Sequence, residues 1–258
     1  MTDPAATIDR IAPTQRPAEG VIGFHTWSKL LFVHWRFSPH EIADLLPSRL
    51  TLDTFDGSAW IGLVPFHMSG VRPWWMPSVP GVSAFHETNV RTYVHLDGEE
   101  PGVWFFSLDA SSSLAVRIAR WKWRLNYFRA DMQLRATAGK VHYQSERLWP
   151  GPVGPGMVIE AETGDLIGAL DKDMPPGQAV PGTLEHFLVE RYVLYAQGHQ
   201  DELLRGRVHH QPYPLREARL LEMQETLLKQ SGIKTHGEPD HVAYSDGVDV
   251  EIFPLRTV

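Results

Sequence analysis

The sequence predicts an α+β protein with a single, β-rich core that encloses a polar pocket. Strand-like segments and tight-turn signals recur along the whole chain, whereas helical periodicity is confined to a few short stretches. One expected strand carries charged groups on a face that is bounded by aromatic residues. The chain has 258 residues, of which 43% are hydrophobic, and this is enough apolar material for one sizeable core.

The expected strands are segments in which apolar, aromatic and β-branched residues are concentrated or alternate with polar ones. They lie at 30–37, 50–55, 58–68, 83–96, 103–108, 157–162 and 242–255, with two more between 128 and 147 around Gly139. The Asp-Gly pairs at 56–57 and 97–98 favour hairpin turns, because both positions accept positive φ values.

Four helices are expected, at 38–47, 111–125, 183–197 and 215–231. The first has the clearest start, with Ser38 as the cap, Pro39 at the first helical position and Glu41 completing a capping box. The second carries an apolar stripe formed by Leu114, Ile118, Trp121 and Leu125. Asp109 lies where a strand gives way to that helix, and we expect it to act as a cap.

Composition limits the classes of function. Residues 1–20 are rich in proline and lack an apolar segment, so we expect a flexible N-terminal arm and one domain over 21–258. The chain has no cysteine and no long apolar run, which favours a soluble, cytoplasmic protein that does not enter a membrane. Its net charge of −7 argues against general nucleic-acid binding.

No cofactor or metal site is expected from the motifs. The chain lacks the glycine-rich nucleotide fingerprints, the nucleophile elbow of the α/β-hydrolases and the paired-histidine zinc motif. His209 and His210 are adjacent, so in a strand their side chains point apart. Arg117, Arg120 and Arg124 are interleaved with tryptophans, but we interpret that segment as an amphipathic surface helix and not as a nucleic-acid site.

The most informative pattern is the alternation along the expected strand at 83–96. Its odd-numbered face carries Glu87, Asn89 and Arg91, spaced about 7 Å apart. Glu87 and Arg91 are then roughly 13 Å apart at the backbone and do not neutralise each other directly. Each needs another partner or a ligand. Two interpretations stay open, a sheltered pocket or a face that is simply wet, as in many antiparallel sheets.

Arg191 is a second anomaly, because it falls within the apolar stripe of the helix expected from Thr183. That stripe consists of Leu184, Phe187, Leu188, Tyr192 and Tyr195. An unpaired buried charge is very costly, so an arginine there needs a carboxylate or several carbonyl groups. We expect Arg191 to meet Glu87, to bind an anionic group of a substrate, or to extend its head group to the surface.

Several motifs together resemble a known family. They are SAFHETNVRTYV at 83–94, LDTFDG at 52–57, VPF at 64–66, FSLDA at 106–110, YFRA at 127–130, GTLEHFL at 182–188 and RY at 191–192. These motifs resemble the YqjF-like domain of unknown function, uncharacterised protein family 2071, from about Trp27 to Leu255. The resemblance implies an acetoacetate decarboxylase-like fold, an antiparallel β-barrel or cone with peripheral helices and a pocket that reaches into the barrel. It implies no activity, because the family is uncharacterised.

The decarboxylase that gives this fold its name uses a lysine that forms a Schiff base. By rough alignment Tyr127 stands at the position of that lysine, and Asn126 stands where relatives usually carry proline. Lys122 is the nearest of the six lysines, but it lies one and a half helical turns earlier. We therefore do not expect Schiff-base decarboxylation.

Two functions stay open. As an enzyme, the chain would act on a small oxygenated acid or carbonyl compound by cofactor-free lyase, hydratase or isomerase chemistry. Arg91 or Arg191 would hold the anionic group and Asn89 would orient a carbonyl. Glu87 would shuttle a proton, and Tyr127 would donate a hydrogen bond to a developing enolate. The alternative is a non-catalytic small-ligand-binding protein with an internally paired pocket. A homo-oligomer is left open.

Overall fold

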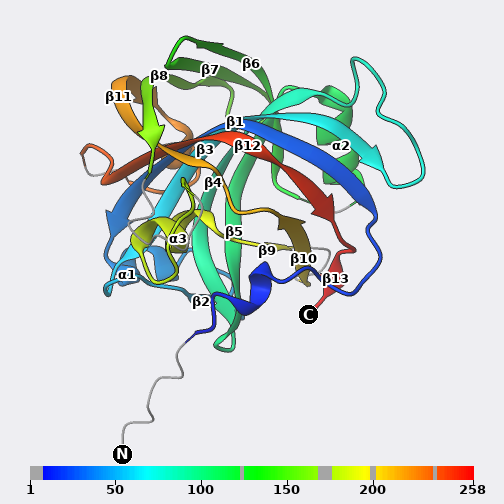
Figure 1. The fold of residues 1–258 in the computed structure, drawn as a ribbon, viewed down its shortest axis with the longest axis vertical. Helices are drawn as coiled ribbons and strands as arrows, with labels where there is room; N and C mark the ends of the chain where they lie inside the picture. Colours follow the sequence, from blue (N-terminus) through cyan, green and yellow to red (C-terminus); the bar gives the residue numbers. More distant parts are fainter. Residues whose placement is uncertain (1–7, 123–124, 168–175, 198–201, 235–236) are drawn as a thin grey trace, which may run out of the picture.

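The computed structural model describes residues 8–122, 125–167, 176–197, 202–234 and 237–258 (Figure 1). Its strands are β1 (Gly23–Phe37), β2 (Thr51–Leu52), β3 (Ala59–Pro73), β4 (Phe85–Leu96), β5 (Glu99–Ala110), β6 (Tyr127–Thr137), β7 (Lys140–Trp149), β8 (Gly154–Leu166), β9 (Val193–Gln197), β10 (Leu203–His210), β11 (Leu215–Glu225), β12 (His241–Ile252) and β13 (Arg256–Thr257). Its helices are α1 (Pro39–Ala43), α2 (Ser113–Lys122), α3 (Leu184–Val189), α4 (Leu227–Gln230) and the 3₁₀ turn η1 (Ala12–Thr14). The described part of the protein is therefore mostly sheet with few helices.

The strands of the described residues form one continuous sheet, in the order β13-β10-β9-β5-β6-β7-β8-β11-β12-β1-β3-β4-β2. Two additional pairings, β4 with β5 and β10 with β12, connect distant parts of that order. The paired strands therefore close into two rings. The first ring runs through β9 and β10, the second runs through β6, β7, β8 and β11, and both share β12, β1, β3, β4 and β5.

The shared strands are mostly buried on both faces along their central parts, because each face lines a different ring. In Figure 1, β6, β7, β8 and β11 lie on one side of these strands, and β9, β10 and β13 lie on the other. Within β1, Leu30 and Phe32 belong to a first hydrophobic core, whereas Leu31 and Val33 belong to a second one. Successive side chains of a strand point to opposite faces, so one strand supplies both cores.

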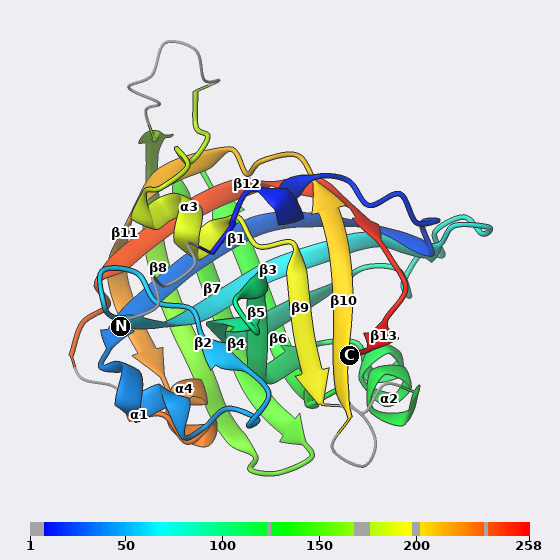
Figure 2. The same cartoon turned by 90° about the horizontal axis from the view of Figure 1, so that it is seen from below.

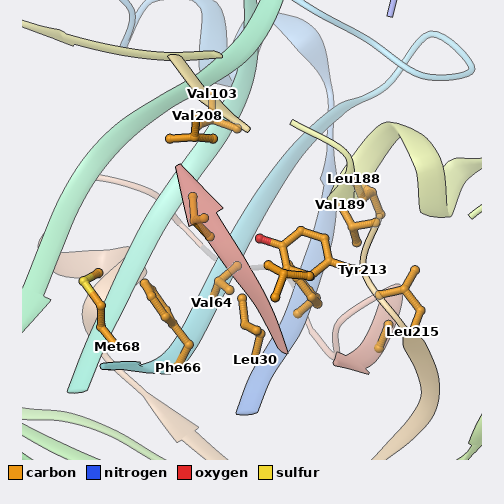
Figure 3. Packing of buried hydrophobic residues seen from close by; sticks show 14 of the residues in the cluster. Leu30, Val64, Phe66, Met68, Val103, Leu188, Val189, Val208, Tyr213 and Leu215 are labelled. Carbon is orange, nitrogen blue, oxygen red and sulfur yellow. The ribbon is translucent and has the colours of Figure 1, made fainter. Parts of the chain in front are cut away.

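The first core lies within the first ring. Figure 3 shows its apolar side chains converging from strands on opposite walls, among them Phe66 of β3 and Val208 of β10. Tyr213, from the connection between β10 and β11, places its hydroxyl group in the middle of this cluster, away from Leu215. The second core packs beneath α1 and α4, which lie together at one corner of the molecule in Figure 2.

Short-range signals set several elements as expected. Pro39 opens α1, and the backbone N–H of Ser38 donates to Oε2 of Glu41 at 3.0 Å, as in a capping box. Asp97 and Gly98 both have positive φ and join β4 to β5. Asp56 and Gly57 also have positive φ, but the short strand before them, β2, pairs with β4 and not with β3.

Two helix predictions are wrong over most of their length. The segment expected as a helix at 183–197 is helical only in α3, after which β9 begins at Val193. The segment expected at 215–231 is strand β11 followed by the short α4. Its residues favour helix intrinsically, but β11 pairs with β8 and β12, and intrinsic propensity is weaker than such tertiary pairing.

The predicted buried face of α2 is also wrong. Leu114, Ile118 and Trp121 are exposed, Trp121 to 81%, whereas Val116 and Ala119 are buried. The helix therefore packs on β5 and β6 with its small residues, and its larger apolar stripe faces outward.

The described part of the N-terminal arm contacts the rest of the chain. Arg10 forms an ion pair with Asp53, and Arg16 forms one with Glu251, so residues 8–20 are tied to the domain. Residues 1–7 lie outside the described part. No helix in the described ranges is long and apolar enough to cross a bilayer.

Candidate active site

The three polar residues of the odd-numbered face of β4 lie inside the first ring. Glu87, Asn89 and Arg91 are only 4%, 6% and 8% exposed. Their cross-strand neighbours on β3 include Phe66 and Val64, both of which belong to the first core. The interpretation of this face as a wet sheet surface is therefore wrong. The reason is topological, because β4 is shared by two rings and has no free face.

Glu87 and Tyr127 form a hydrogen-bonded pair. The hydroxyl of the partly buried Tyr127 donates to Oε2 of Glu87 at 2.9 Å. The parallel pairing of β5 with β6 places Tyr127 beside Leu108. Two residues further along β5, Ala110 pairs with Glu87 of β4. The two residues are 40 positions apart in the sequence, and parallel strand pairing brings them together.

The environment of Glu87 brings its pKa close to neutral pH. Burial raises the pKa of Glu87 to about 7, the hydrogen bond from Tyr127 acts in the opposite direction, and the nearby Asp109 carboxylate adds to the rise. Burial, together with Glu87, raises the pKa of Tyr127 well above its usual value. Near pH 7, Glu87 is therefore divided between its two protonation states, while Tyr127 stays a neutral hydrogen-bond donor.

Asp109 does not cap a helix, so that prediction is wrong. Its carboxylate is fully buried and forms a two-pronged ion pair with Arg147, whose Nε donates to Oδ2 at 2.8 Å. The guanidinium of Arg147 also stacks on Phe128, 3.7 Å from the ring centre. Asp109 pairs with Thr88 across the strands and thus points to the face opposite Glu87. It acts on Glu87 through its charge and not by contact.

Arg91 lies inside the ring without a carboxylate partner among the described residues. Its Nη2 donates to the carbonyl oxygen of Leu188 at 2.9 Å, and its guanidinium lies 5.7 Å from the ring centres of Phe32 and Tyr93. In the same part of the structure, Nε of Arg91 and Oδ1 of Asn89 are buried without a hydrogen-bond partner. Such groups are expensive unless something pairs with them.

Arg191 pairs with Asp53 and not with Glu87, so the prediction that it meets Glu87 is wrong. Its Nη1 donates to Oδ2 of Asp53 at 2.8 Å, and its Nε donates to the carbonyl oxygen of Phe187 at 2.7 Å. Arg191 follows α3 and does not lie within a helix, and the turn of the chain there directs it to Asp53. Asp53 also pairs with Arg10.

We find no lysine beside Tyr127, the position of the Schiff-base lysine, among the residues that the structure describes. Lys140, Lys229 and Lys234 are exposed. Lys29 lies near His67 and His86, where burial lowers the pKa of both histidines and the charge of Lys29 lowers it further. The side chains of Lys122 and Lys172 lie outside the described residues.

Within the described ranges, no three His, Asp or Glu side chains gather as metal ligands do. His209 and His210 point apart, as expected. His209 lies beside Glu251 at the surface and His210 is buried.

Sequence reasoning missed the structural roles of Asp53, Asp109, Arg147 and His210. The first three belong to ion pairs between distant segments, which no local pattern reveals. His210 had a usable signal, because in β10 it lies on the same face as the apolar Val208.

Comparisons with known proteins agree with this fold. Residues 25–249 match the family DUF2071, described as an uncharacterized conserved protein. The chain is 34% identical over 231 residues to the uncharacterized protein YqjF of Bacillus subtilis (strain 168), covering 90% of each.

Solved structures with a similar fold include an acetoacetate decarboxylase-like enzyme from Sphingomonas wittichii RW1, with a TM-score of 0.60 and 11% identity over 93% of this chain and 94% of that one. An acetoacetate decarboxylase has a TM-score of 0.59 and 13% identity, over 94% of this chain and 92% of that one. The enduracididine biosynthesis enzyme MppR, complexed with pyruvate, has a TM-score of 0.58 and 13% identity, over 94% of this chain and 93% of that one. At such identities the likeness concerns the fold alone.

Proposed function

Because the chain belongs to DUF2071, a family of uncharacterized conserved proteins, and shares its fold with enzymes, we propose that it is itself an enzyme. It acts on a small oxygenated organic acid or carbonyl compound inside the first ring, by acid–base chemistry that needs no cofactor. The observation that carries the proposal is Glu87, a buried carboxyl group with a pKa of about 7 that is hydrogen-bonded to Tyr127.

Glu87 suits proton transfer at neutral pH. A general base works best when its pKa lies near the working pH, because it is then often ionised and still binds a proton well. Burial supplies this property, since Glu87 has no cation beside it among the described residues to stabilise its charged form.

The proposed step is the removal of a proton from the carbon next to a carbonyl group. The proton moves to Glu87, and the electron pair of the C–H bond passes into an enolate. The hydroxyl of Tyr127 then donates a hydrogen bond to the enolate oxygen. Return of the proton to a different atom gives an isomer. Loss of a β-hydroxyl group, which leaves as water with the proton from Glu87, gives a dehydrated product instead.

Arg91 and Asn89 would hold the substrate. A substrate carboxylate would supply the countercharge that Arg91 lacks in the described part of the protein, and its oxygens would satisfy the unpaired Nε. The amide of Asn89 would orient the carbonyl group. We leave Arg191 out of the binding set, because Asp53 already neutralises it.

The proposed step is tested by hydrogen exchange in deuterated water. Purified protein is incubated in D₂O with pyruvate, 2-oxobutanoate or acetoacetate, and proton NMR follows the loss of the signals next to the carbonyl group. We expect faster exchange than in buffer for at least one acid, with a midpoint near pH 7. Glu87→Gln should lower the rate by about 100-fold or more.

Glu190→Gln is the matched control. Glu190 is also a buried carboxyl group, but Tyr192 and the backbone N–H of Tyr213 already satisfy it. Exchange that survives in Glu87→Gln would remove Glu87 from the chemistry. Acids that stabilise the protein in thermal melts without any exchange would overturn the catalytic proposal in favour of a ligand-binding protein.

A further inference from the structure

A second group of unpaired polar atoms lies on another wall of the first ring, at His210 and Trp27. His210 ends β10 and is 3% exposed. Its ring stacks on Tyr192, 4.4 Å away at an angle of 19°, and packs against Tyr213 at 4.6 Å. Trp27 of β1 lies 6.1 Å from His210. These aromatic contacts hold the imidazole of His210 in place, so its unpaired nitrogen has a defined position.

The hydrogen bonds of His210 fix which of its nitrogens carries the proton. Nδ1 lies 2.8 Å from the carbonyl oxygen of Gln211, which can only accept. Nδ1 is therefore the donor and Nε2 keeps its lone pair. Burial lowers the pKa of His210 to about 4, so the ring is neutral at physiological pH. Nε2 is thus a buried acceptor, and nothing in the described part of the chain donates to it.

Trp27 supplies the complementary group. Its Nε1–H is a buried donor that likewise has no acceptor within the described ranges. Its ring centre lies 6.1 Å from that of His210 and 5.9 Å from that of Phe66, and Phe66 is the cross-strand neighbour of Glu87. The unpaired donor and acceptor therefore belong to the interior that contains Glu87, and they are two side chains away from it.

We infer that His210 and Trp27 form a second end of the substrate site, which takes a hydroxyl group. A hydroxyl is the simplest group that donates to one neighbour and accepts from another, so it satisfies Nε2 of His210 and Nε1–H of Trp27 together. The inference rests on the proposed function and narrows its substrate class. The substrate is an oxo acid with a hydroxyl group on the carbon chain, away from the carboxylate that Arg91 would hold.

The test uses three matched pairs of acids that differ only in a terminal hydroxyl. They are hydroxypyruvate and pyruvate, 4-hydroxy-2-oxobutanoate and 2-oxobutanoate, and 5-hydroxy-2-oxopentanoate and 2-oxopentanoate. Calorimetric titration of the whole protein measures the affinity of each. At one chain length, we expect the hydroxylated acid to bind about tenfold tighter than its partner, as two net hydrogen bonds would give.

Two variants and one control make the result specific. Trp27→Phe removes the indole N–H, and His210→Phe removes Nε2 together with the Nδ1 that donates to Gln211; both variants keep an aromatic ring. Both should abolish most of the preference for the hydroxylated acid and leave the affinity for its partner nearly unchanged. His209→Phe is the control, because His209 lies on the opposite face of β10. The preference should survive there. Thermal melts check that each variant folds.

The possible failures are distinguishable. If the unhydroxylated acids bind and their binding needs Arg91, but the hydroxyl gives no advantage at any length, the inference is overturned and the proposed function stands. A preference that persists in both Trp27→Phe and His210→Phe overturns it equally. If no acid of either kind binds, the inference and the proposed function fall together.

Discussion

The hydroxyl of Tyr127 donates a 2.9 Å hydrogen bond to Oε2 of Glu87, inside a ring of strands that leaves Glu87 almost no contact with solvent. This hydrogen bond stabilises the ionised carboxylate, whereas burial destabilises it, and burial is the stronger effect. The proton affinity of Glu87 therefore results from two opposing contributions, and each can be removed separately.

Removing the hydroxyl should raise the pKa of Glu87 further. In Tyr127→Phe the carboxylate loses the bond that favours its charged form, so the midpoint of proton exchange against pH should move above pH 7. Carbon-13 NMR of the Glu87 carboxyl group measures the same shift without relying on activity. Tyr192→Phe, which removes a hydroxyl from Glu190 instead, should leave this midpoint unchanged. A midpoint that stays fixed or falls in Tyr127→Phe would contradict the assignment.

Glu87 should also make the stability of the protein depend on pH. Its pKa is 4.5 when unperturbed and about 7 in the fold, so the folded state binds its proton more tightly. The stabilising contribution is complete below pH 4.5 and is lost as the pH rises to about 7, by an amount on the order of 3 kcal/mol. Urea unfolding of the natural protein and of Glu87→Gln should show this difference, and parallel pH curves would count against it.

Arg91 and Arg191 should respond differently to the same substitution. Arg91→Met removes a cation that has no acidic partner in the described residues, so it should weaken the binding of an organic acid by about 30-fold and leave the melting temperature nearly unchanged. Arg191→Met leaves the buried Asp53 with Arg10 alone and should destabilise the fold by about 3 kcal/mol. Titration calorimetry and thermal melts separate the two effects. Loss of stability without loss of binding in Arg91→Met would reverse the assignment.

The exposed stripe of α2 gives a test of the packing. Leu114→Ser should change the free energy of unfolding by less than about 0.5 kcal/mol, because Leu114 faces outward. Val116→Ala should cost about 1–2 kcal/mol, because Val116 is buried against the first core. Denaturant unfolding measures the free energy of unfolding of both variants. A larger loss in Leu114→Ser than in Val116→Ala would mean that the stripe containing Leu114 is the buried face of α2.

Local sequence patterns predict β3, β4 and β5 well, whereas they miss β9, β10 and β11. The segment at 83–96 has strict alternation and an Asp-Gly turn, and β4 and its hairpin with β5 form as expected. The segment at 215–225 is rich in Leu, Glu and Arg and favours helix, yet pairing with β8 and β12 makes it a strand. Alternation reflects the geometry of a strand and is kept in the sheet, whereas helix propensity is a weak preference that pairing on both sides of β11 overcomes.

The sequence by itself determined that Glu87, Asn89 and Arg91 share one face of a strand, because side-chain direction in a strand depends only on its period of two. Only the tertiary structure decided that this face is enclosed, and which groups meet there. Tyr127 donates a hydrogen bond to Glu87, 40 residues away in the sequence, and Arg191 donates one to Asp53, 138 residues away. The closing of the sheet into rings sets those encounters, and it arises from long-range strand pairing that no local pattern contains.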